Sequence, residues 1–250
     1  MNRDTFIQVA LRSDPDTLVK LCLSNKSYYN IYKENKEYIC KKFLEKYQVE
    51  YTDPSNFIYV YNKVNFDDYS LGESYDYKKL LELYMKNFYL KEIECDSMGI
   101  SSFPIYPNMT HFNGDDNKLK YFPVQPEMTH FYGASNKLEF FPIQPKMTYF
   151  NGGFNRLACF PIQPVMEYFW GEDNELISFP VQPNMKGFIG NDNKLTSFPV
   201  QPKMEDFFGN SNQLRSFPIQ PEMIFFLGDI EDIAFFPHQP KMKEFHRGSN

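Results

Sequence analysis

The strongest constraint on the fold of this chain is a 19-residue repeat that starts at Phe103. The unit reads F-P-[VI]-Q-P-x-M-x-x-F-x-G-x-x-N-x-L-x-x, in seven full copies and a truncated eighth without insertions. A short, fixed period predicts a solenoid in which each copy forms one coil and packs on its neighbours. The Phe-Pro pairs that mark the copies start at Phe103, Phe122, Phe141, Phe160, Phe179, Phe198, Phe217 and Phe236.

Within each copy, the Met, Phe, Gly, Asn and Leu positions match the leucine-rich-repeat pattern L-x-x-L-x-L-x-x-N-x-L. The M-x-x-F-x-G segment therefore predicts a short strand that pairs in parallel with the strands of adjacent coils. The return segment F-P-x-Q-P holds two prolines three residues apart, which excludes a helix and favours an extended or polyproline-like backbone. The unit resembles the short LPX type of leucine-rich repeat, with Phe in place of Leu before Pro.

Two features of the unit predict how the coil interior is filled. Gly stands where an inward apolar residue is usual, so we expect the Phe two residues earlier to fill that space and to stack on its equivalents. The Asn is expected to turn inward, because an amide that both donates and accepts suits a buried bend. This predicted ladder contains Asn117, Asn136, Asn155, Asn174, Asn193 and Asn212.

The pattern predicts three regions: a helical domain over 1–50, a helical linker and cap over 51–88, and the solenoid over 89–250. The segment 90–100 fits the repeat register imperfectly and predicts a degenerate first coil. Tyr75–Phe88 has apolar residues at helical spacing and is expected to cap the solenoid. At the other end the last copy has no capping segment after it, which allows a homo-oligomeric contact there.

The first fifty residues are unrelated to the repeat. The string D-P-D-T-L-V-K-L-C-L-S-N-K-S-Y-Y-N-I, followed by I-C-K-K-F, resembles an F-box over about residues 4 to 46. With LPX-like repeats in a chain rich in Asn, Lys, Phe and Tyr, it is similar to repeat proteins of giant amoeba-infecting DNA viruses of the pithovirus-like group. The resemblance implies docking to a host Skp1-type ubiquitin-ligase adaptor through Phe6, Leu18, Leu21, Leu23 and Tyr28.

Charge and composition narrow the classes of partner. Lys+Arg number 26 and Asp+Glu 32, for a formal net charge of −6, and basic runs are missing. These features argue against nucleic acid or an anionic membrane as a partner. No stretch approaches the roughly 20 apolar residues of a spanning helix, and the N-terminus has no signal-peptide pattern. We therefore expect an intracellular, cytoplasmic protein, in the host cytoplasm if it is viral, with reduced cysteines.

Catalytic patterns are missing from the sequence, so no enzymatic activity, cofactor or metal is expected. The glycines recur once per coil rather than in a phosphate-binding loop, and neither H-E-x-x-H nor G-x-S-x-G occurs. His111 and His130 occupy equivalent positions of adjacent coils and would lie about 5 Å apart. Two solvated histidines are the favoured interpretation there, with a metal pair as the alternative.

The residues on either side of the core Phe should point outward from the sheet, on the concave face. In the middle copies these outward residues are apolar, and an exposed apolar patch of this kind usually marks an interaction site. The predicted target-binding residues are Tyr132, Tyr149, Tyr168, Trp170, Ile189, Phe208, Phe225 and Leu227.

The sequence thus predicts an α+β chain: an F-box-like helical head, then a right-handed leucine-rich-repeat solenoid with a parallel sheet. The favoured function is non-enzymatic substrate recognition, linking a protein target on the sheet to a Skp1-type adaptor. Three alternatives stay open. The aromatic stripe could be buried in a homo-oligomer, the chain could be a plain scaffold whose head is only a cap, or it could be a fragment of an effector-type E3 ligase.

Overall fold

The structure is a computed structural model that describes residues 1–13, 15–47, 88–229, 233 and 235–248. The chain divides into two compact units. One comprises the described residues up to Tyr89 together with Pro104–Tyr106, and the other comprises Leu90–Phe103 and the described residues from Pro107 onward. The predicted capping helix over 75–88 falls almost wholly outside the described residues.

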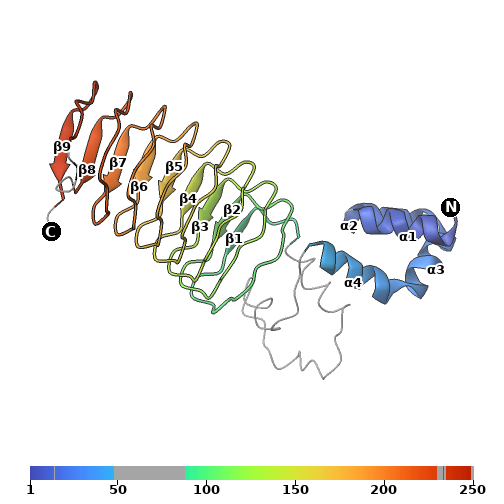
Figure 1. The fold of residues 1–250 in the computed structure, drawn as a ribbon. Helices are drawn as coiled ribbons and strands as arrows, with labels where there is room; N and C mark the ends of the chain where they lie inside the picture. The colour runs from blue at the N-terminus through green and yellow to red at the C-terminus, as the bar shows by residue number, and fades with distance from the viewer. Residues whose placement is uncertain (14, 48–87, 230–232, 234, 249–250) are drawn as a thin grey trace. The chain divides into compact units, whose positions relative to one another are not determined.

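The first unit contains four helices (Figure 1): α1 (Arg3–Arg12), α2 (Pro15–Ser24), α3 (Lys26–Glu34) and α4 (Lys36–Lys46). Its core contains Phe6, Ala10 and Ile39, each at most 1% exposed. Apolar residues of α1, α2 and α3 pack around these side chains. The apolar side chains of these helices therefore pack on one another within the unit, and those of α3 are only partly buried.

Asn35 separates α3 from α4 in a stretch whose sequence reads as one helical segment. The Asn35 side chain donates from Nδ2 to the carbonyl of Ile31 at 2.8 Å and accepts from Arg3 Nη2 at 2.7 Å. An Asn side chain that bonds nearby backbone competes with the helical ladder and favours a helix end. The chain therefore turns at this residue, and α4 continues in a new direction.

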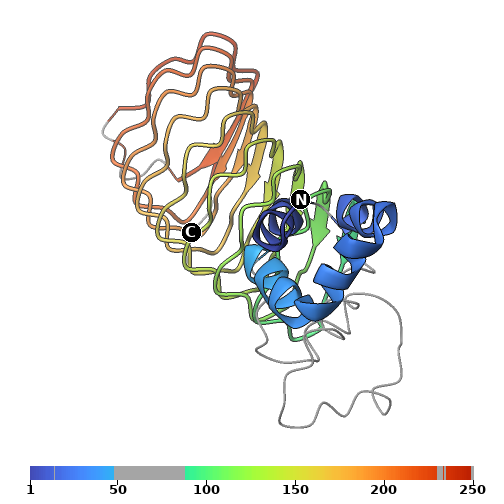
Figure 2. The ribbon, with the colours of Figure 1, turned by 90° about the vertical axis from the view of Figure 1, so that its right-hand side faces the viewer.

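The second unit is a parallel solenoid, as the repeat predicts (Figures 1 and 2). In its described part, nine short strands form one sheet in sequence order, and each residue lies opposite the residue 19 positions later. The strands are β1 (Glu92–Glu94), β2 (His111–Asn113), β3 (His130–Tyr132), β4 (Tyr149–Asn151), β5 (Tyr168–Trp170), β6 (Gly187–Ile189), β7 (Asp206–Gly209), β8 (Phe225–Gly228) and β9 (Glu244–Arg247).

Two columns of stacked Phe rings fill the solenoid core. The middle residue of each strand from β2 onward supplies the first column, whose ring centroids are 5.3–5.4 Å apart, as between Phe131 and Phe150. The Phe of each Phe-Pro pair supplies the second column, where Phe141 and Phe160 are 5.9 Å apart. Rings of the two columns meet edge to face, as Phe131 and Phe141 do at 4.7 Å. Both geometries are favourable for aromatic pairs.

The expected complementarity of Phe and Gly is confirmed. A Cβ added to Gly133 would lie 2.3 Å from Cζ of Phe131, well inside van der Waals contact. The glycines at the same position of the other copies meet their own Phe in the same way. The Phe ring therefore occupies the space that a side chain at the Gly position would need.

The Asn ladder is also confirmed, and Asn155 illustrates it. Its Nδ2 donates to the carbonyls of Gly133, Gly152 and Gly153 at 2.9–3.1 Å. Its Oδ1 accepts the N–H of Leu138 in the preceding coil at 2.9 Å. Each Asn thus satisfies backbone groups of two coils at a bend where the sheet has ended.

A second amide ladder, which is not apparent from the repeat pattern, runs along the proline side. Gln163 is fully buried, and its Nε2 donates to the carbonyl of Pro142 at 3.0 Å. Its own N–H donates to Oε1 of Gln182 in the next coil at 2.8 Å. Because proline has no N–H and the polyproline conformation makes no internal bonds, this side cannot form a sheet. The Gln side chains supply the missing links between coils.

A tight bend precedes each ladder Asn. The residue before it has a left-handed backbone, with φ between 49° and 55° in Asp116, Ser135, Phe154 and their equivalents. Asp and Ser are small or locally bonding residues at such a bend, whereas Phe is bulky and rarely left-handed. Phe154 is also 54% exposed, so its ring gains little from burial.

Candidate protein-binding face

Two rows of side chains cover the outward face of the sheet, and we call them together the outer sheet face. One row is the residue before the core Phe of each strand and the other is the residue after it. The central residue is buried and its two neighbours are partly or fully exposed in most strands, as in β3, β4 and β5. All eight predicted target-binding residues lie on this face.

Aromatic rings make diagonal contacts across β3, β4 and β5. Tyr149 lies between Tyr132 and Trp170, with ring centroids 5.1 Å and 5.2 Å away. The Tyr149–Trp170 pair is edge to face, with an interplanar angle of 65°. Trp170 is 38% exposed and Tyr168 40% exposed. These rings therefore support one another while leaving apolar surface open to solvent.

Gly187 makes room for the ring of Tyr168 on the adjacent strand. A Cβ on Gly187 would lie 3.0 Å from Cδ1 of Tyr168. The Tyr168 ring therefore leans over β6 and extends the aromatic surface toward Ile189. A larger residue at 187 would displace that ring.

A second aromatic cluster lies further along the sheet on β7 and β8. Phe208 and Phe225 stack at 4.8 Å with an interplanar angle of 25°. Leu227 lies opposite Phe208 in the strand register. Both Phe side chains are partly buried. Apolar side chains are therefore found on this face from the Tyr149–Trp170 cluster to β8, with Ile189 between the two aromatic groups.

Burial raises the pKa of the central tyrosine. The pKa of Tyr149 lies well above its ordinary value, first because of burial and then because of Tyr132, Glu172 and Asp115. A tyrosine hydroxyl is protonated in the physiological range even at its ordinary pKa, so Tyr149 carries its proton there. It can donate a hydrogen bond to a bound partner while the ring makes apolar contacts.

His111 and His130 stack face to face, with ring centroids 4.4 Å apart and nearly parallel planes. Thr129 Oγ1 lies 2.9 Å from Nδ1 of His130 and 3.0 Å from the carbonyl of Thr110. The hydroxyl proton goes to the carbonyl, so Oγ1 accepts from Nδ1–H and the Nε2 lone pair is left outward. Parallel lone pairs on stacked rings do not converge on one ion. The described residues hold no group of three or more His, Cys, Asp or Glu placed for a metal.

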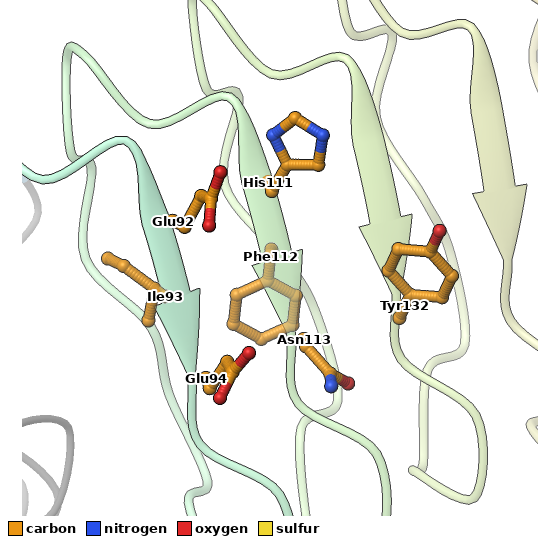
Figure 3. Close-up of a pocket in the computed structure, with 7 residues that line it drawn as sticks. All are labelled: Glu92, Ile93, Glu94, His111, Phe112, Asn113 and Tyr132. Carbon is orange, nitrogen blue, oxygen red and sulfur yellow. The ribbon is translucent and has the colours of Figure 1, made fainter.

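A pocket with a volume of about 230 Å³ lies at the first two strands (Figure 3). Glu92 lies beside His111 and Glu94 beside Asn113, in the register of β1 and β2, and Tyr132 closes the side toward β3. Asn113 Nδ2 donates to Asp96 at 3.2 Å. The outer sheet face therefore carries two carboxylates at its first coil and has its aromatic clusters further along, on β3–β5 and β7–β8.

The predicted adaptor-binding residues are divided between core and surface, and this corrects the role expected of Phe6. Phe6 is fully buried and stacks on Tyr28 at 5.5 Å, so it stabilises the head instead of forming a docking surface. Leu18 and Leu21 are partly buried against the same core. Leu23 is 80% exposed and is the residue of this set that offers a free apolar side chain.

One exposed apolar row was not predicted from the sequence. The residue after the first seven Phe-Pro pairs is Val or Ile, and in six successive coils it is 43–53% exposed. The signal was present in the repeat as the [VI] position. It was obscured because β-branched residues in an extended segment read as buried. This row lies on the proline side, away from the outer sheet face.

Two further findings concern membrane-spanning helices and cysteine reactivity. None of the helices in the described part of the chain is long and apolar enough to cross a membrane. Cys95 is buried, and burial raises the pKa of its thiol, so it is not an activated nucleophile.

No protein-family model and no curated protein matches the chain. Among solved structures, YopM from Yersinia enterocolitica WA-314 is 22% identical with a TM-score of 0.53, covering 56% of this chain and 33% of that one. The leucine-rich effector protein YopM from Yersinia pestis is 16% identical with a TM-score of 0.42, covering 66% and 67%. The match thus spans about a third of the first protein's length. At these identities the first similarity shows the fold alone: a short helical region followed by a leucine-rich-repeat solenoid.

Proposed function

We propose that this chain is a non-enzymatic protein-recognition module that captures a protein target on its outer sheet face. The observation that carries the proposal is the cluster of Tyr132, Tyr149 and Trp170, whose rings contact one another at 5.1–5.2 Å and remain partly exposed. Tyr and Trp are the residues most often found as interface hot spots. Their mutual contacts hold the rings in place before binding, which lowers the entropic cost of ordering them.

The experiment is affinity capture from an amoebal lysate by the full chain, with proteins identified by mass spectrometry, followed by affinity measurement with the purified target. Trp170→Glu should weaken binding at least a hundredfold while leaving the unfolding midpoint close to that of the original chain. The matched control is Ile177→Glu, an equally apolar and more exposed residue outside the sheet. If Trp170→Glu leaves binding unchanged, or if the control variant weakens binding equally, the target does not bind at this face.

We further propose that the helical unit links the captured target to a Skp1-type adaptor of a host ubiquitin ligase, acting in the host cytoplasm. The F-box-like sequence motivates this role, and the 80% exposure of Leu23 supplies a side chain able to insert into an adaptor groove. The proposed contact residue is Leu23, with the partly buried Leu18, Leu21 and Tyr28 at its edge. The fully buried Phe6 is not included.

Titration of a purified Skp1-type adaptor onto the full chain tests the second role separately from the first. Leu23→Glu should abolish adaptor binding and leave target capture intact, since the two surfaces belong to different units. The highest adaptor concentration, about 100 µM, is enough to detect even a weak, transient complex. If the adaptor does not bind the unaltered chain at that concentration, the adaptor role is wrong and the chain is a binding scaffold alone. Detection of ubiquitin transfer by the chain alone would favour the effector-ligase alternative.

A further inference from the structure

The proline side of the solenoid carries an unbroken row of exposed aliphatic side chains, which we call the aliphatic row. It consists of one residue per coil: Val124, Ile143, Ile162, Val181, Val200 and Ile219, each 43–53% exposed. The row is not explained by the interior, because the Phe two residues before it and the Gln directly after it are buried, whereas these residues are exposed. From this row and its charged border we infer that the proline side is a docking surface for a second copy of the same chain.

The repeats could have kept the aliphatic row uniform simply because they arose by duplication. The other exposed positions argue against this explanation. Other exposed positions of the same coils have diversified freely. The residue after the second proline, which we call the corner row, runs Glu127, Lys146, Val165, Asn184, Lys203, Glu222 and Lys241. The second proline of each copy is equally uniform, but its residue type is set by the backbone conformation it imposes. Apart from that position, the aliphatic row is the one that keeps one chemistry through six exposed positions. Large exposed apolar surfaces on soluble proteins usually mark contacts.

Two copies that pack through this side in opposite directions are related by a two-fold axis at the coil of Val181 and Asn184. In that register Ile143 faces Ile219 of the other copy, Ile162 faces Val200, and Val181 faces itself. Five of the six residues of the aliphatic row are then covered by their equivalents, and Val124 faces His238 of the other copy. An isologous contact of this kind closes on itself and gives a dimer instead of a filament.

The charges of the corner row select this register. It places Glu127 of one copy opposite Lys241 of the other, and Lys146 opposite Glu222. The remaining charge of the row, Lys203, faces the uncharged Val165. Moving the axis by half a coil in either direction brings Glu127 opposite Glu222, or Lys146 opposite Lys241. Like charges across an interface oppose association, so the alternative registers are disfavoured.

These four residues already form two ion pairs within one copy, Lys146 with Glu127 and Lys241 with Glu222. All four side chains are between 43% and 55% exposed, so they are accessible to a partner. In the dimer each pair would meet the reversed pair of the other copy and form a four-charge cluster. The aromatic border agrees with this arrangement, because it places exposed Tyr121 opposite Phe235, which is 75% exposed.

The size of the surface sets the expected strength. Seven coils at about 4.8 Å per rung make this side about 29 Å long. Six residue steps of about 3.1 Å make it about 19 Å wide, or on the order of 600 Å² per copy. This is below the roughly 800 Å² per partner of a standard interface, so we expect a dissociation constant in the micromolar range.

Sedimentation equilibrium of the full chain between about 1 and 200 µM tests the proposal, because that range brackets a micromolar dimer. Two double variants carry the test: Glu127→Lys with Lys146→Glu, and Glu222→Lys with Lys241→Glu. Each reverses one ion pair, which keeps the pair within the copy but places like charges opposite in its own dimer. We expect each variant alone to associate at least tenfold more weakly, and an equal mixture of the two to recover dimerisation.

A second variant locates the axis. Val181→Cys in a Cys159→Ser background should form a disulfide-linked dimer under mild oxidation, because residue 181 faces itself. Gln213→Cys, on the opposite edge of a neighbouring coil, is the control and should remain monomeric. A chain that stays monomeric at 200 µM overturns the proposal. So does a mixture of the double variants that associates no better than either alone. All these assays use the chain without target or adaptor, so their failure leaves the proposed function untouched.

Discussion

The ring of Phe169 fills the space in which Gly171 would otherwise carry a side chain. A Cβ built on Gly171 would lie 2.3 Å from Cζ and 2.5 Å from Cε1 of that ring. The ring cannot easily move aside, because it is stacked between Phe150 at 5.3 Å and Phe188 at 5.4 Å. The Phe ring fits only because the residue two positions later is Gly. The two residues therefore form one structural feature, which is repeated in every full coil.

Gly171→Ala is expected to lower the free energy of unfolding by about 2 to 3 kcal/mol, the upper range for overpacking a filled core. Urea denaturation followed by circular dichroism measures the change. Gly153→Ala is the control, because its added Cβ would meet the flexible Glu172 side chain at 3.1 Å and the Glu172 carbonyl at 3.3 Å. Equal losses in the two variants would contradict a specific role for the Phe ring.

Asn155→Asp should be more damaging than its small change in shape suggests. Aspartate cannot donate to the carbonyls of Gly133, Gly152 and Gly153, which would face a carboxylate instead. Each of these three carbonyls would lose its partner, at a cost of about 1 to 3 kcal/mol per buried group. We therefore expect the free energy of unfolding to fall by at least about 3 kcal/mol. Thermal unfolding measures it. An equivalent loss for Asn151→Asp, on the outer sheet face, would show that added charge and not the ladder is responsible.

The solenoid could be predicted in detail because each of its structural positions is repeated. The inward Phe, the compensating Gly and the Asn at the bend were all deduced from one 19-residue unit. The Gln ladder was missed although it is equally periodic. A Gln between two prolines suggests an exposed polyproline segment. That it is buried follows only when the lack of proline N–H groups is set against the need to link neighbouring coils.

The helical head could be predicted less well, because it occurs once. Its amphipathic stretches indicated helices, but the end of α3 at Asn35 depends on contacts with Ile31 and with the distant Arg3. The burial of Phe6 depends on how α1 packs against α3 and α4, which no local pattern encodes. The aromatic face could be assigned to the outside of the sheet by strand alternation alone. The ring contacts of Tyr149 with Trp170 could not.

Phe154→Asn is expected to stabilise the chain by about 1 kcal/mol, because Asn tolerates the left-handed backbone that Phe adopts at a cost. The φ angle of Phe154 is 55°, and its ring is 54% exposed, so little burial is lost. Chemical denaturation of the two chains in parallel provides the comparison. A less stable variant would mean that the Phe154 ring makes contacts that outweigh the backbone strain.

The His111–His130 stack predicts a dependence of stability on pH. Burial, and then His111, lowers the pKa of His130 below its ordinary value of 6.5. The unfolded chain therefore binds a proton near pH 6.5 that the folded chain binds only at lower pH. The stability is complete above about pH 6.5 and falls as the pH drops through that value toward the folded pKa.

Unfolding free energies measured between pH 8 and 5 test this dependence. His130→Gln should remove that part of the slope, and His111→Gln should reduce it by taking away the second charge. The opposite result would be a stability that rises as the pH falls through this range, with a slope that His130→Gln abolishes. It would mean that the pKa of His130 is raised in the folded chain.

Each strand residue pairs with the residue 19 positions later, so the register of the sheet advances by one complete coil at a time. Loss or gain of a single residue within a coil would misalign the Asn, Gln and Phe columns together. Loss or gain of a whole coil would keep every column continuous. The length of the outer sheet face can therefore change only in increments of about 4.8 Å. A binding surface of this kind is lengthened by adding repeats and altered in specificity by changing the two outward residues of each strand.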